Sequence, residues 1–406
     1  MSGCDHADSD VLIVGAGAVG ATLALALARA GRRVIVLDAR PGPTPRPGAD
    51  YANFVVSLNL ASSAVLARLG VWSEIAATRV SPYVGMELWD AGGGGHTRFD
   101  SAEIGEPVLG HFVENALLES VLHAALEAEA RVDMRWGESI AGLEAGSEYR
   151  YLRLDNDREL AAPLIVGADG ARSQVREFTG IAVRDHDYEQ RALVCNFATE
   201  RPHGAIARQR FLPGGPVAML PLADGRCALA WFRPPEEADE LLALDDADFC
   251  ARLSVATDHV LGAVTAAEAR FAPRIKRQHA ERYVDDRVAL VGDAAHAIHP
   301  LAGQGLNLGL LDAASLAEHV GGRGDPGQAL RLRRYARARR SHNTAVMAAM
   351  DGFHFGFAYG GSMQATLRSL GMNLADRAGP IKQTFIRHGS GLAGDLPALA
   401  RPQPRS

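Results

Sequence analysis

The sequence predicts an α/β fold in which a parallel sheet between helices is combined with an antiparallel sheet and a helical C-terminal region. Three patterns support this. Four apolar residues, Val11–Val14, lead through a glycine-rich turn into an alanine-rich helix pattern. Apolar and polar residues alternate between about residues 185 and 275, as in half-buried strands. Helical periodicity dominates from about residue 331. With 406 residues the chain exceeds one average domain, so two lobes are expected.

The opening strand is followed by a GxGxxG pattern. It is formed by Gly15, Gly17 and Gly20, and Asp38 closes the next apolar strand. In a Rossmann-type unit the first glycine permits a tight turn, the second lets the backbone approach a pyrophosphate, and the third lets helix and strand pack closely. The helix N-terminus supplies amides for the anion, and an acidic residue such as Asp38 accepts hydrogen bonds from a ribose. The pattern therefore predicts a dinucleotide site, with a tight turn that binds no ligand as the alternative.

Further elements follow in order along the chain. Residues 60–75 have helical spacing, and alternation in 85–100 around a run of glycines predicts a hairpin. The pattern is helical again over 111–129, and 164–181 repeats a buried strand that runs into a turn. After the antiparallel region, residues 287–300 return to the strand-and-turn pattern of the first unit.

Composition argues against several classes of function. The 42 basic and 48 acidic residues form no basic block, which argues against a nucleic-acid surface and leaves small molecules as the expected partners. The 4 cysteines lie far apart without a CxxC pair, so neither a zinc ribbon nor a disulfide framework is expected. The polar start is unlike a secretory signal, and no apolar run approaches the roughly 18 residues of a spanning helix. We expect a cytoplasmic protein, soluble or peripheral to the inner membrane.

Two later strand ends carry the motifs that separate a flavin from a nicotinamide dinucleotide. Asp169 and Gly170 lie in LIVGADGARSQVR, and Gly292 and Asp293 lie in RVALVGDAAHAIHPLAGQGLNLGLLDAASLA. These segments resemble the Asp-Gly and Gly-Asp motifs of single-component aromatic hydroxylases that use FAD. The segments LGVW, FDSAEIGEPVLGHFVENALLESVL and GPVAMLPLADGRCALAW are similar to the ubiquinone-biosynthesis hydroxylases, which act on polyprenylated phenols. The resemblance extends from about residue 10 to about residue 400.

The resemblance implies a fold, a domain division and a reaction. The fold is like that of para-hydroxybenzoate hydroxylase: a Rossmann-like FAD-binding domain of the glutathione-reductase type, an interleaved antiparallel-sheet substrate domain and a C-terminal helical region. The implied ranges are 9–75, 100–183 and 276–330 for the FAD-binding domain, 76–99 and 184–275 for the substrate domain, and 331–406 for the C-terminal region. The implied reaction is reduction of FAD by NAD(P)H, capture of dioxygen as a flavin C4a-hydroperoxide, and transfer of its outer oxygen to a phenolic ring. The expected substrate is a polyprenylated precursor in ubiquinone biosynthesis.

The resemblance also implies the residues of the site. Those implied to contact FAD are Gly15, Gly17, Ala18, Val19, Gly20, Asp38, Ala39, Arg40, Asp169, Gly170, Gly292, Asp293, Pro300, Gly303, Gly305, Leu306 and Asn307. Those implied to be catalytic are Pro300, Gly303, Gln304 and Asn115. Asp293 is expected to bind ribitol hydroxyls, with helix capping as the alternative. Asp169 is expected to bridge the FAD and NAD(P)H regions, with a partnerless Asp-Gly turn as the alternative.

The glycine-rich bend before the last of these residues has a physical interpretation. Pro300, Gly303 and Gln304 let the chain pass close to a flat ring, and the helix that begins near Leu306 directs its first amides at the N1 and C2 edge of that ring. A helix N-terminus stabilises the negative charge of reduced flavin there by about 0.3–1 kcal/mol when exposed, and by more when dry. The bend comes late because the first βαβ unit holds the adenosine end, and a distant return to the same sheet holds the flavin end.

Other candidate residues have structural explanations. His296 and His299 have no third ligand at metal spacing, so no metal site is expected. Phe211, Met219 and Trp231 are candidates to wall an aromatic substrate, but core packing is the favoured interpretation.

Phe54 departs from the family pattern. The family usually has an arginine in a DxR sequence after the proline-rich loop, and an ungapped alignment from LGVW places Phe54 there. That arginine normally helps to hold the FAD phosphates or the mobile flavin, so its absence bears on cofactor affinity, flavin movement and activity. Nearby, the family places His111, Glu114 and Asn115 beside the ring and the substrate, and an ordinary helix start explains them almost equally well.

Alternative functions therefore stay open beside the hydroxylase. One is a flavin-dependent reductase or halogenase on the same scaffold, although the chain has no WxWxIP segment of the halogenase kind. Another is a non-catalytic paralogue that carries FAD or lipid within a biosynthetic complex. No second nucleotide motif is present, so NAD(P)H is expected to bind transiently, and a protein redox donor is not excluded. The aromatic residues 353–359 and the basic residues 331–340 suggest a membrane or a partner, with a packed C-terminal subdomain as the alternative.

Overall fold

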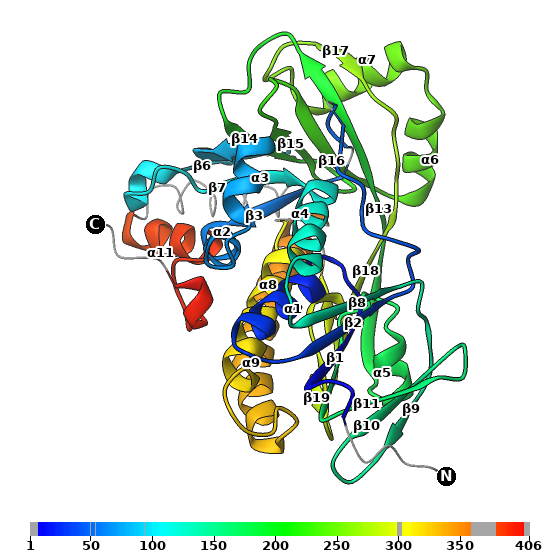
Figure 1. Ribbon diagram of the computed structural model, residues 1–406. Coiled ribbons are helices and arrows are strands. Elements are labelled where there is room, and N and C mark those ends of the chain that lie inside the picture. Colours follow the sequence, from blue (N-terminus) through cyan, green and yellow to red (C-terminus); the bar gives the residue numbers. More distant parts are fainter. Residues whose placement is uncertain are drawn as a thin grey trace.

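A mostly parallel sheet forms the half of the molecule that carries the first glycine motif (Figure 1). The computed structural model describes residues 7–48, 50–52, 54–92, 94–298, 303–358 and 379–401. Within them this sheet has six strands, in the order β19, β20, β12, β1, β2, β8. Its strands are β1 (Val11–Val14), β2 (Val34–Asp38), β8 (Val132–Trp136), β12 (Leu164–Gly167), β19 (Val284–Asp285) and β20 (Val288–Leu290). Its described pairings are parallel except that of β19 with β20. Every residue of β1 is buried, as expected for a central strand of a parallel sheet that is covered on both faces.

Helices pack on this sheet and on one another. α1 (Ala18–Arg29) contacts α4 (Asn115–Glu127) and α8 (Gly305–Val320), and α9 (Ala329–Ala358) packs on α8. α5 (Gln174–Phe178) follows β12. α1 is buried along nearly its whole length because the sheet lies on one side of it and other helices on the other. This arrangement confirms the predicted α/β fold with a Rossmann-like domain.

A second, mostly antiparallel sheet forms the other half of the molecule. Among the described residues it has nine strands, eight in the order β21, β18, β13, β16, β15, β14, β5, β6, with β17 paired to β13. Its strands are β5 (Gly85–Asp90), β6 (His96–Asp100), β13 (Val183–Thr199), β14 (Ile206–Phe211), β15 (Val217–Pro221), β16 (Cys227–Arg233), β17 (Val264–Ala267), β18 (Arg274–Ala280) and β21 (His296–Ala297). The predicted antiparallel region and the hairpin of β5 and β6 are both present, and β14 pairs with β5 in parallel. α6 (Pro235–Ala243) and α7 (Asp246–Ala256) contact strands of this sheet.

A small sheet lies between the two halves and corrects one prediction. It is formed by β3 (Val55–Asn59), β7 (Gly110–Glu114) and β4 (Ser81–Tyr83), all antiparallel. Residues 111–129 are therefore not helical throughout: α4 begins only at Asn115. Phe112 and Val113 fit a strand or a helix equally well in so short a window, and pairing with both β3 and β4 decides for the strand.

The predicted helix over 60–75 is also divided. α2 (Leu60–Arg68) and α3 (Trp72–Thr78) are separate helices. Gly70, at φ +63°, ends the first of them because a left-handed residue cannot continue a helix. η1 (Ser101–Ile104) follows β6, and a further sheet holds β9 (Ile140–Ala145), β10 (Arg150–Leu154) and β11 (Glu159–Ala162).

The C-terminal region returns to the cofactor half. α9 is helical as predicted, and α11 (Gly379–Gly389) and η4 (Ala398–Ala400) follow. η4 contacts α2 and α8, and the Leu60 N–H donates to the Ser390 carbonyl at 3.0 Å. The side chains of the aromatic residues 353–359 lie outside the described set. The domain boundaries stay a prediction, and β18 runs along β13 across the boundary expected at 275/276.

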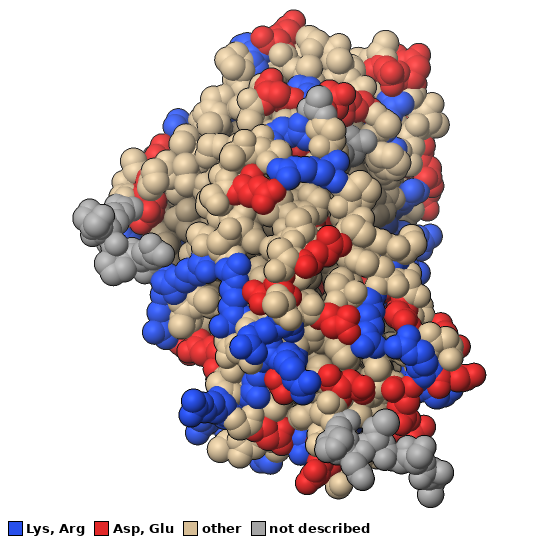
Figure 2. Space-filling model, viewed as in Figure 1, with Lys and Arg blue, Asp and Glu red and all other residues tan. Residues whose placement is uncertain are grey.

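Charge is mixed on the surface. Figure 2 shows acidic and basic groups interspersed over one face, with basic groups densest in the lower left of the view. Among the described residues no single helix has the length and apolar character to cross a membrane, and α2 with α3 meets those two criteria only as a pair bent by 114°.

Candidate functional site

The first glycine motif brings β1, α1 and the end of β12 into backbone contact. Gly15 has φ +102°, and a Cβ there would lie 2.4 Å from the Ala168 carbonyl oxygen. A Cβ on Gly20 would lie 2.0 Å from the Gly15 carbonyl oxygen. Gly17 differs, because the nearest atom to a Cβ there is a Glu119 carboxylate oxygen at 3.8 Å. Gly15 and Gly20 are thus required by packing, whereas Gly17 keeps open space at the start of the helix.

The start of α1 has the features of an anion site. Its N-cap residue, Gly17, provides no side-chain cap, so the first amides of the helix have no intrahelical acceptor. Ala18 is buried, and the Val19 side chain fills the space above Gly292 and Gly309. A Cβ on Gly309 would lie 2.6 Å from a Val19 methyl group. The first and third predicted motifs therefore touch through Val19.

Asp38 is held by a network that sequence reasoning did not foresee. Its carboxylate accepts from the Ala16 N–H at 2.7 Å and from the backbone and guanidinium of Arg40. Although burial raises it, these hydrogen bonds hold the pKa of Asp38 below its usual value. The four donors fill both carboxylate oxygens. A ribose can reach Asp38 only where Arg40, whose side chain is 39% exposed, swings away. Ala39 is exposed beside them.

Arg40 also reaches α4. It donates to Glu119 at 2.9 Å, and Glu119 accepts from Thr44 at 2.8 Å and from the Asn115 amide at 3.2 Å. The structure therefore places the Asn115 side chain beside Gly17, through Glu119. Glu119 is one turn after Asn115 on α4, a spacing that sequence reasoning could have used.

The second motif, after β12, holds a buried polar atom without a partner. Asp169 Oδ2 accepts from the Val175 N–H at 3.2 Å, at the start of α5. Asp169 Oδ1 is buried and has no partner among the described residues. Burial raises the pKa of Asp169, although hydrogen bonds from Ser173 and Val175 oppose that rise. Gly170 has φ +78° with open space around it. Asp169 therefore has a structural role through one oxygen and leaves the other for a ligand.

The third motif, after β20, presents a second carboxylate. Gly292 has φ +58° and begins η2 (Gly292–Ala294), whose N-cap residue is Val291. Asp293 is thus not the N-cap residue, and the capping alternative is wrong. Asp293 is exposed, although the protein atoms packed around its carboxylate raise its pKa. Asp312 raises the pKa of Asp293 further, and His296 opposes that rise.

The glycine-rich bend leads into α8 as predicted. Gly303 has φ +61°, and a Cβ there would lie 2.8 Å from the Ser57 Cβ. α8 begins at Gly305, and Gln304 before it forms no side-chain cap, so the amides of the first turn are available. Leu306 packs against the main core. Pro300 and His299 lie outside the described residues.

Asn307 is fully engaged within the protein. It accepts from the Asn59 N–H at 2.9 Å and from Ser62 Oγ at 2.7 Å. Its amide donates to the Ser57 and Gly303 carbonyls at 2.8 and 2.9 Å. A contact of Asn307 with a cofactor is therefore left to its backbone, while its side chain fixes the bend against β3.

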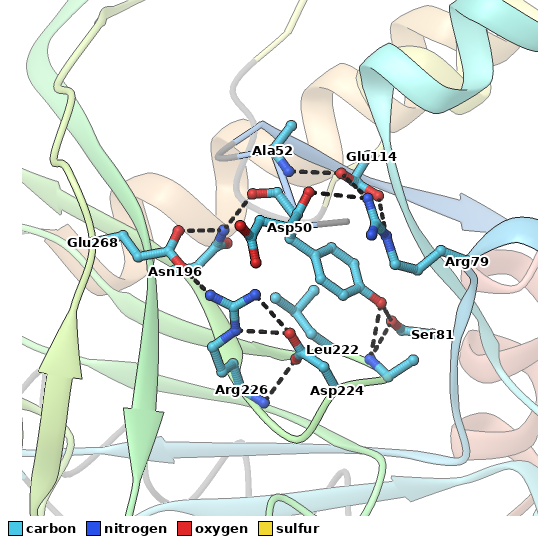
Figure 3. A network of polar contacts seen from close by, with 12 residues as sticks. Asp50, Ala52, Arg79, Ser81, Glu114, Asn196, Leu222, Asp224, Arg226 and Glu268 are labelled. Atoms are coloured by element: carbon cyan, nitrogen blue, oxygen red, sulfur yellow. Dashed lines mark hydrogen bonds and ion pairs between the residues drawn. The ribbon is translucent and has the colours of Figure 1, made fainter. Parts of the chain in front are cut away.

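The segment before β3 is fixed by the network in Figure 3. The Tyr51 hydroxyl pairs with Ser81 Oγ at 3.1 Å, and the Arg79 guanidinium lies 4.5 Å from the centre of the Tyr51 ring. Arg79 also donates to Glu114, whose side chain has no exposed surface, and Glu114 accepts from the Ala52 N–H at 2.6 Å. Sequence reasoning placed Glu114 beside the substrate, but the structure engages it in this brace.

Phe54 and His111, two other predicted residues of this region, lie outside the network of Arg79 and Glu114. Phe54 follows the braced segment, its side chain is 60% exposed, and its carbonyl accepts from the Asn115 N–H at 3.0 Å. His111 lies in β7 with its ring 4.9 Å from that of Trp72, and burial lowers the pKa of His111 to about 4.

The two faces of the nine-stranded sheet differ in side-chain size. Met219 and Trp231 are buried in the core that includes α6 and α7 residues, and Phe211 is also buried, so core packing is confirmed for them. On the opposite face Ala230 pairs with Val194 and with Ala218.

These alanines line the face that meets the braced segment. Tyr51 packs on Ala228 and Leu222, and Val55 of β3 joins them. Two residues further along β3, Ser57 touches Gly303. A chain of contacts thus connects the alanine face to the bend before α8. Alternation of small and large residues in PVAMLP and CALAW was the available signal, and sequence reasoning selected the large ones.

The three strand ends together fit an extended flavin dinucleotide. Uncapped helix starts at α1 and α8, the unpartnered Asp169 Oδ1 and the exposed Asp293 are groups that such a ligand can satisfy. Among the described residues no three His, Cys, Asp or Glu side chains gather as metal ligands would.

Comparisons with known proteins agree with this geometry. Residues 8–350 match a family model described as FAD binding domain. The chain is 36% identical over 389 residues to 3-demethoxyubiquinol 3-hydroxylase of Escherichia coli, covering 95% of this chain and 99% of that protein. It is 36% identical to ubiquinone hydroxylase UbiL of Rhodospirillum rubrum, covering 98% and 93%. It is 31% identical to the human mitochondrial ubiquinone biosynthesis monooxygenase COQ6, covering 94% and 92%.

Solved structures share the fold. p-Nitrophenol 4-monooxygenase PnpA from Pseudomonas putida superposes with a TM-score of 0.75 at 20% identity, covering 93% of this chain and 96% of that one. HpxO from Klebsiella pneumoniae, solved with FAD, superposes with a TM-score of 0.73 at 19% identity, covering 93% and 98%. PqsL of P. aeruginosa, solved with 2-aminobenzoylacetate, superposes with a TM-score of 0.71 at 27% identity, covering 90% and 99%.

Proposed function

Since the chain belongs to the family of FAD-dependent aromatic-ring monooxygenases, we propose that it hydroxylates the phenolic ring of a polyprenylated quinone precursor. The observation that carries the proposal is the close packing of three flavin motifs on one another, in a chain similar over almost its whole length to ubiquinone-biosynthesis hydroxylases. NAD(P)H is the proposed electron donor.

FAD, when bound and reduced, activates dioxygen for transfer of one oxygen atom to an electron-rich ring. The amides at the start of α1 would hold its pyrophosphate, and Asp38 its adenosine ribose after Arg40 moves. Asp293 would accept from the ribitol hydroxyls, and Asp169 would meet the ligand through its free oxygen. The first amides of α8 would face the pyrimidine edge and stabilise negative charge there.

The alanine face is the proposed wall of the substrate site. Val194 and Ala230 lie opposite each other on adjacent strands and are only partly buried, so the small side chain leaves room above the sheet. An apolar wall of this kind suits a phenol with a hydrocarbon tail and keeps water away from the reacting atoms. A site of this shape orients the ring through contact area, while the cofactor supplies the reactivity.

A substrate with a hydrocarbon tail is expected to reach the protein from a membrane surface. The outward side of α9 exposes Arg333, Arg334, Arg337 and Arg340. Basic side chains on one helix face favour an anionic lipid surface, each worth about 1 kcal/mol near such a surface. We therefore propose a peripheral membrane contact through α9, with mixing of purified protein and anionic or neutral vesicles as the test.

Turnover of the purified protein tests the proposed reaction. The protein is loaded with FAD, and NAD(P)H oxidation and oxygen uptake are measured with and without a short-tailed prenylated phenol. The expected result is stimulation by the phenol and a product heavier by one oxygen atom. A protein that binds no FAD would overturn the proposal. Bound FAD with no hydroxylated product from any donor would favour the carrier alternative.

A further inference from the structure

One face of α9 is aimed at the third motif. Tyr335, Arg339 and Asn343 follow one another at intervals of four residues, so they share a face of the helix. All three are buried, with 0, 2 and 0% of their surface exposed. The Tyr335 hydroxyl donates to the Leu290 carbonyl at 2.7 Å, at the end of β20. This face therefore meets the strand that leads into Gly292 and Asp293.

Asp312 on α8 is the centre of the contact. Its Oδ1 accepts from Arg339 Nε at 2.8 Å and from the Asn343 amide at 3.1 Å. Its Oδ2 accepts from the Gly292 N–H at 3.2 Å and lies 2.5 Å from His296 Nε2. The side chain has no exposed surface. One oxygen of the carboxylate thus faces α9, and the other faces the turn of the Gly-Asp motif.

Arg339 and Asp312 form a buried ion pair at the centre of this cluster. Burial raises the pKa of Asp312, but His296 and Arg339 outweigh it and hold that pKa at about 2. Arg339 donates further to Asn343 Oδ1 at 2.9 Å and to the Leu308 carbonyl at 3.4 Å. A buried ion pair contributes little net stability compared with apolar residues of the same volume. What it supplies here is a fixed direction for a carboxylate that accepts from the backbone of the turn.

We propose that Arg339 is a positioning residue for the flavin and that α9 is part of the cofactor site. Arg339 holds Asp312 so that Oδ2 fixes the Gly292 amide, and this in turn sets the direction of the neighbouring Asp293 carboxylate. The inference rests on the proposed function in one respect, the assignment of Asp293 to the ribitol hydroxyls. Arg339 itself touches neither cofactor nor substrate and acts through Asp312 and the turn.

Affinity for FAD is the readout that separates positioning from stability. Apoprotein is titrated with FAD, and quenching of flavin fluorescence gives the Kd, with the Tm of each apoprotein measured in parallel. Arg339→Met is expected to raise the Kd roughly tenfold or more, the size typical of partners that orient a ligand-binding group. Arg339→Lys is expected to recover part of the loss because it keeps a charge beside Asp312. Arg323→Met, which changes an exposed arginine between α8 and α9, is the matched control and is expected to keep the Kd.

A double-mutant cycle tests the route of the effect. If Arg339 acts through Asp293, then Arg339→Met adds little to the change caused by Asp293→Ala, whereas independent effects add in full. Where Arg339→Met lowers the Tm too far, Asp312→Asn with Arg339→Met removes both charges together and preserves the fold, and the same rise in Kd is expected.

The outcomes are distinguishable. A native Kd in Arg339→Met, in a folded protein, overturns the inference, and so does full additivity with Asp293→Ala. In both cases the proposed function stands, because native protein still binds FAD. A protein that binds no FAD in any form overturns the proposed function itself.

Discussion

The six-stranded and nine-stranded sheets bury their residues in different ways. In the first, both faces are buried, and at Gly15 and Gly20 the backbones approach so closely that no methyl group fits. In the second, one face packs large side chains against α6 and α7, and the other carries alanines, of which Ala230 is partly accessible. Close contacts between main-chain atoms shape the cofactor half. Small side chains on one face of the sheet shape the proposed substrate half. Short glycine motifs in the sequence therefore predict the cofactor half, whereas only the alternation of small and large residues indicates the substrate half.

The largest effect is expected from a methyl group at the tightest main-chain contact. Gly20→Ala places a carbon 2.0 Å from the Gly15 carbonyl oxygen. We expect the free energy of unfolding to fall by about 5 kcal/mol or more, measured by urea denaturation. Gly17→Ala is the matched control because its Cβ has room, and a loss within about 1 kcal/mol is expected there. Gly17→Ala should nevertheless weaken FAD binding, since a methyl group would stand where the pyrophosphate approaches. Equal stability losses in both variants would end the argument from close contact.

The next largest loss of stability is expected from the ion pair of Arg79 and Glu114, which braces the segment before β3. Arg79→Met leaves the Glu114 carboxylate unpaired at 0% exposure, and a loss of about 3–5 kcal/mol is expected in the same measurement. The control is Arg46→Met, which breaks a pair whose members are 52% and 49% exposed, so a loss of less than about 1 kcal/mol is expected. A small effect from Arg79→Met would mean that the segment before β3 does not depend on its brace.

One histidine from each half connects stability to pH. Burial, with nearby charges, lowers the pKa of His279 on β18 and of His342 on α9 to about 4, from an ordinary value near 6.5. Between those values the unfolded chain binds more protons than the folded one, so stability falls as the pH falls from about 6.5 to about 4. Denaturation at a series of pH values checks this. His279→Gln and His342→Gln should each flatten the profile in this window, and an unchanged slope in both would contradict the assignment.

Filling the alanine face should affect the substrate half alone. Ala230→Leu adds bulk at a partly buried position of β16. We expect FAD affinity to stay native, the KM for a prenylated phenol to rise about tenfold, and more hydrogen peroxide to be released per NAD(P)H oxidised. Steady-state kinetics with peroxide detection measures this. A native KM would place the substrate elsewhere.

The smallest effect on stability is expected at Phe54. Its side chain is 60% exposed, so Phe54→Arg should change the free energy of unfolding by no more than about 0.5 kcal/mol. The added charge should tighten FAD binding, because the family arginine is implied to hold the phosphates. Titration of the apoprotein with FAD measures this, and unchanged affinity would show that the missing arginine is of no consequence to cofactor binding here.

Sequence reasoning located the cofactor half better than the rest. A position with positive φ, or one without room for a Cβ, requires glycine, and a glycine is visible in the sequence. This is why Gly15, Gly20, Gly292 and Gly303 were found. Arg40 illustrates what was not found: the residue was named, but not its grip on Asp38 and Glu119, since that pairing depends on where α4 lies. Arg339 and Asp312 lie 27 residues apart on consecutive helices, and no local pattern indicates that their side chains meet.

In the substrate half, the sequence predicted the strands but not the residues of the proposed site. Alternation predicted the strands, yet the choice between the two faces depended on which one α6 and α7 cover. The sequence does not show which face that is. It favoured core packing for Phe211, Met219 and Trp231, which the structure confirms, but it did not indicate the alanines of the opposite face. Residues 111–114 were misassigned for a related reason, because the pairing of β7 with β3 and β4 is not local.

The order in which the elements are synthesised bears on when the cofactor site is complete. β1 emerges first and its neighbour β2 soon after it, but its other neighbour, β12, begins only at Leu164 and β20, beyond β12, only at Val288. α8 and the inward face of α9 come later still. Such distant pairing is slow to form. A nascent chain thus carries an open nucleotide cradle through most of translation, and it can capture its flavin only when synthesis is nearly finished.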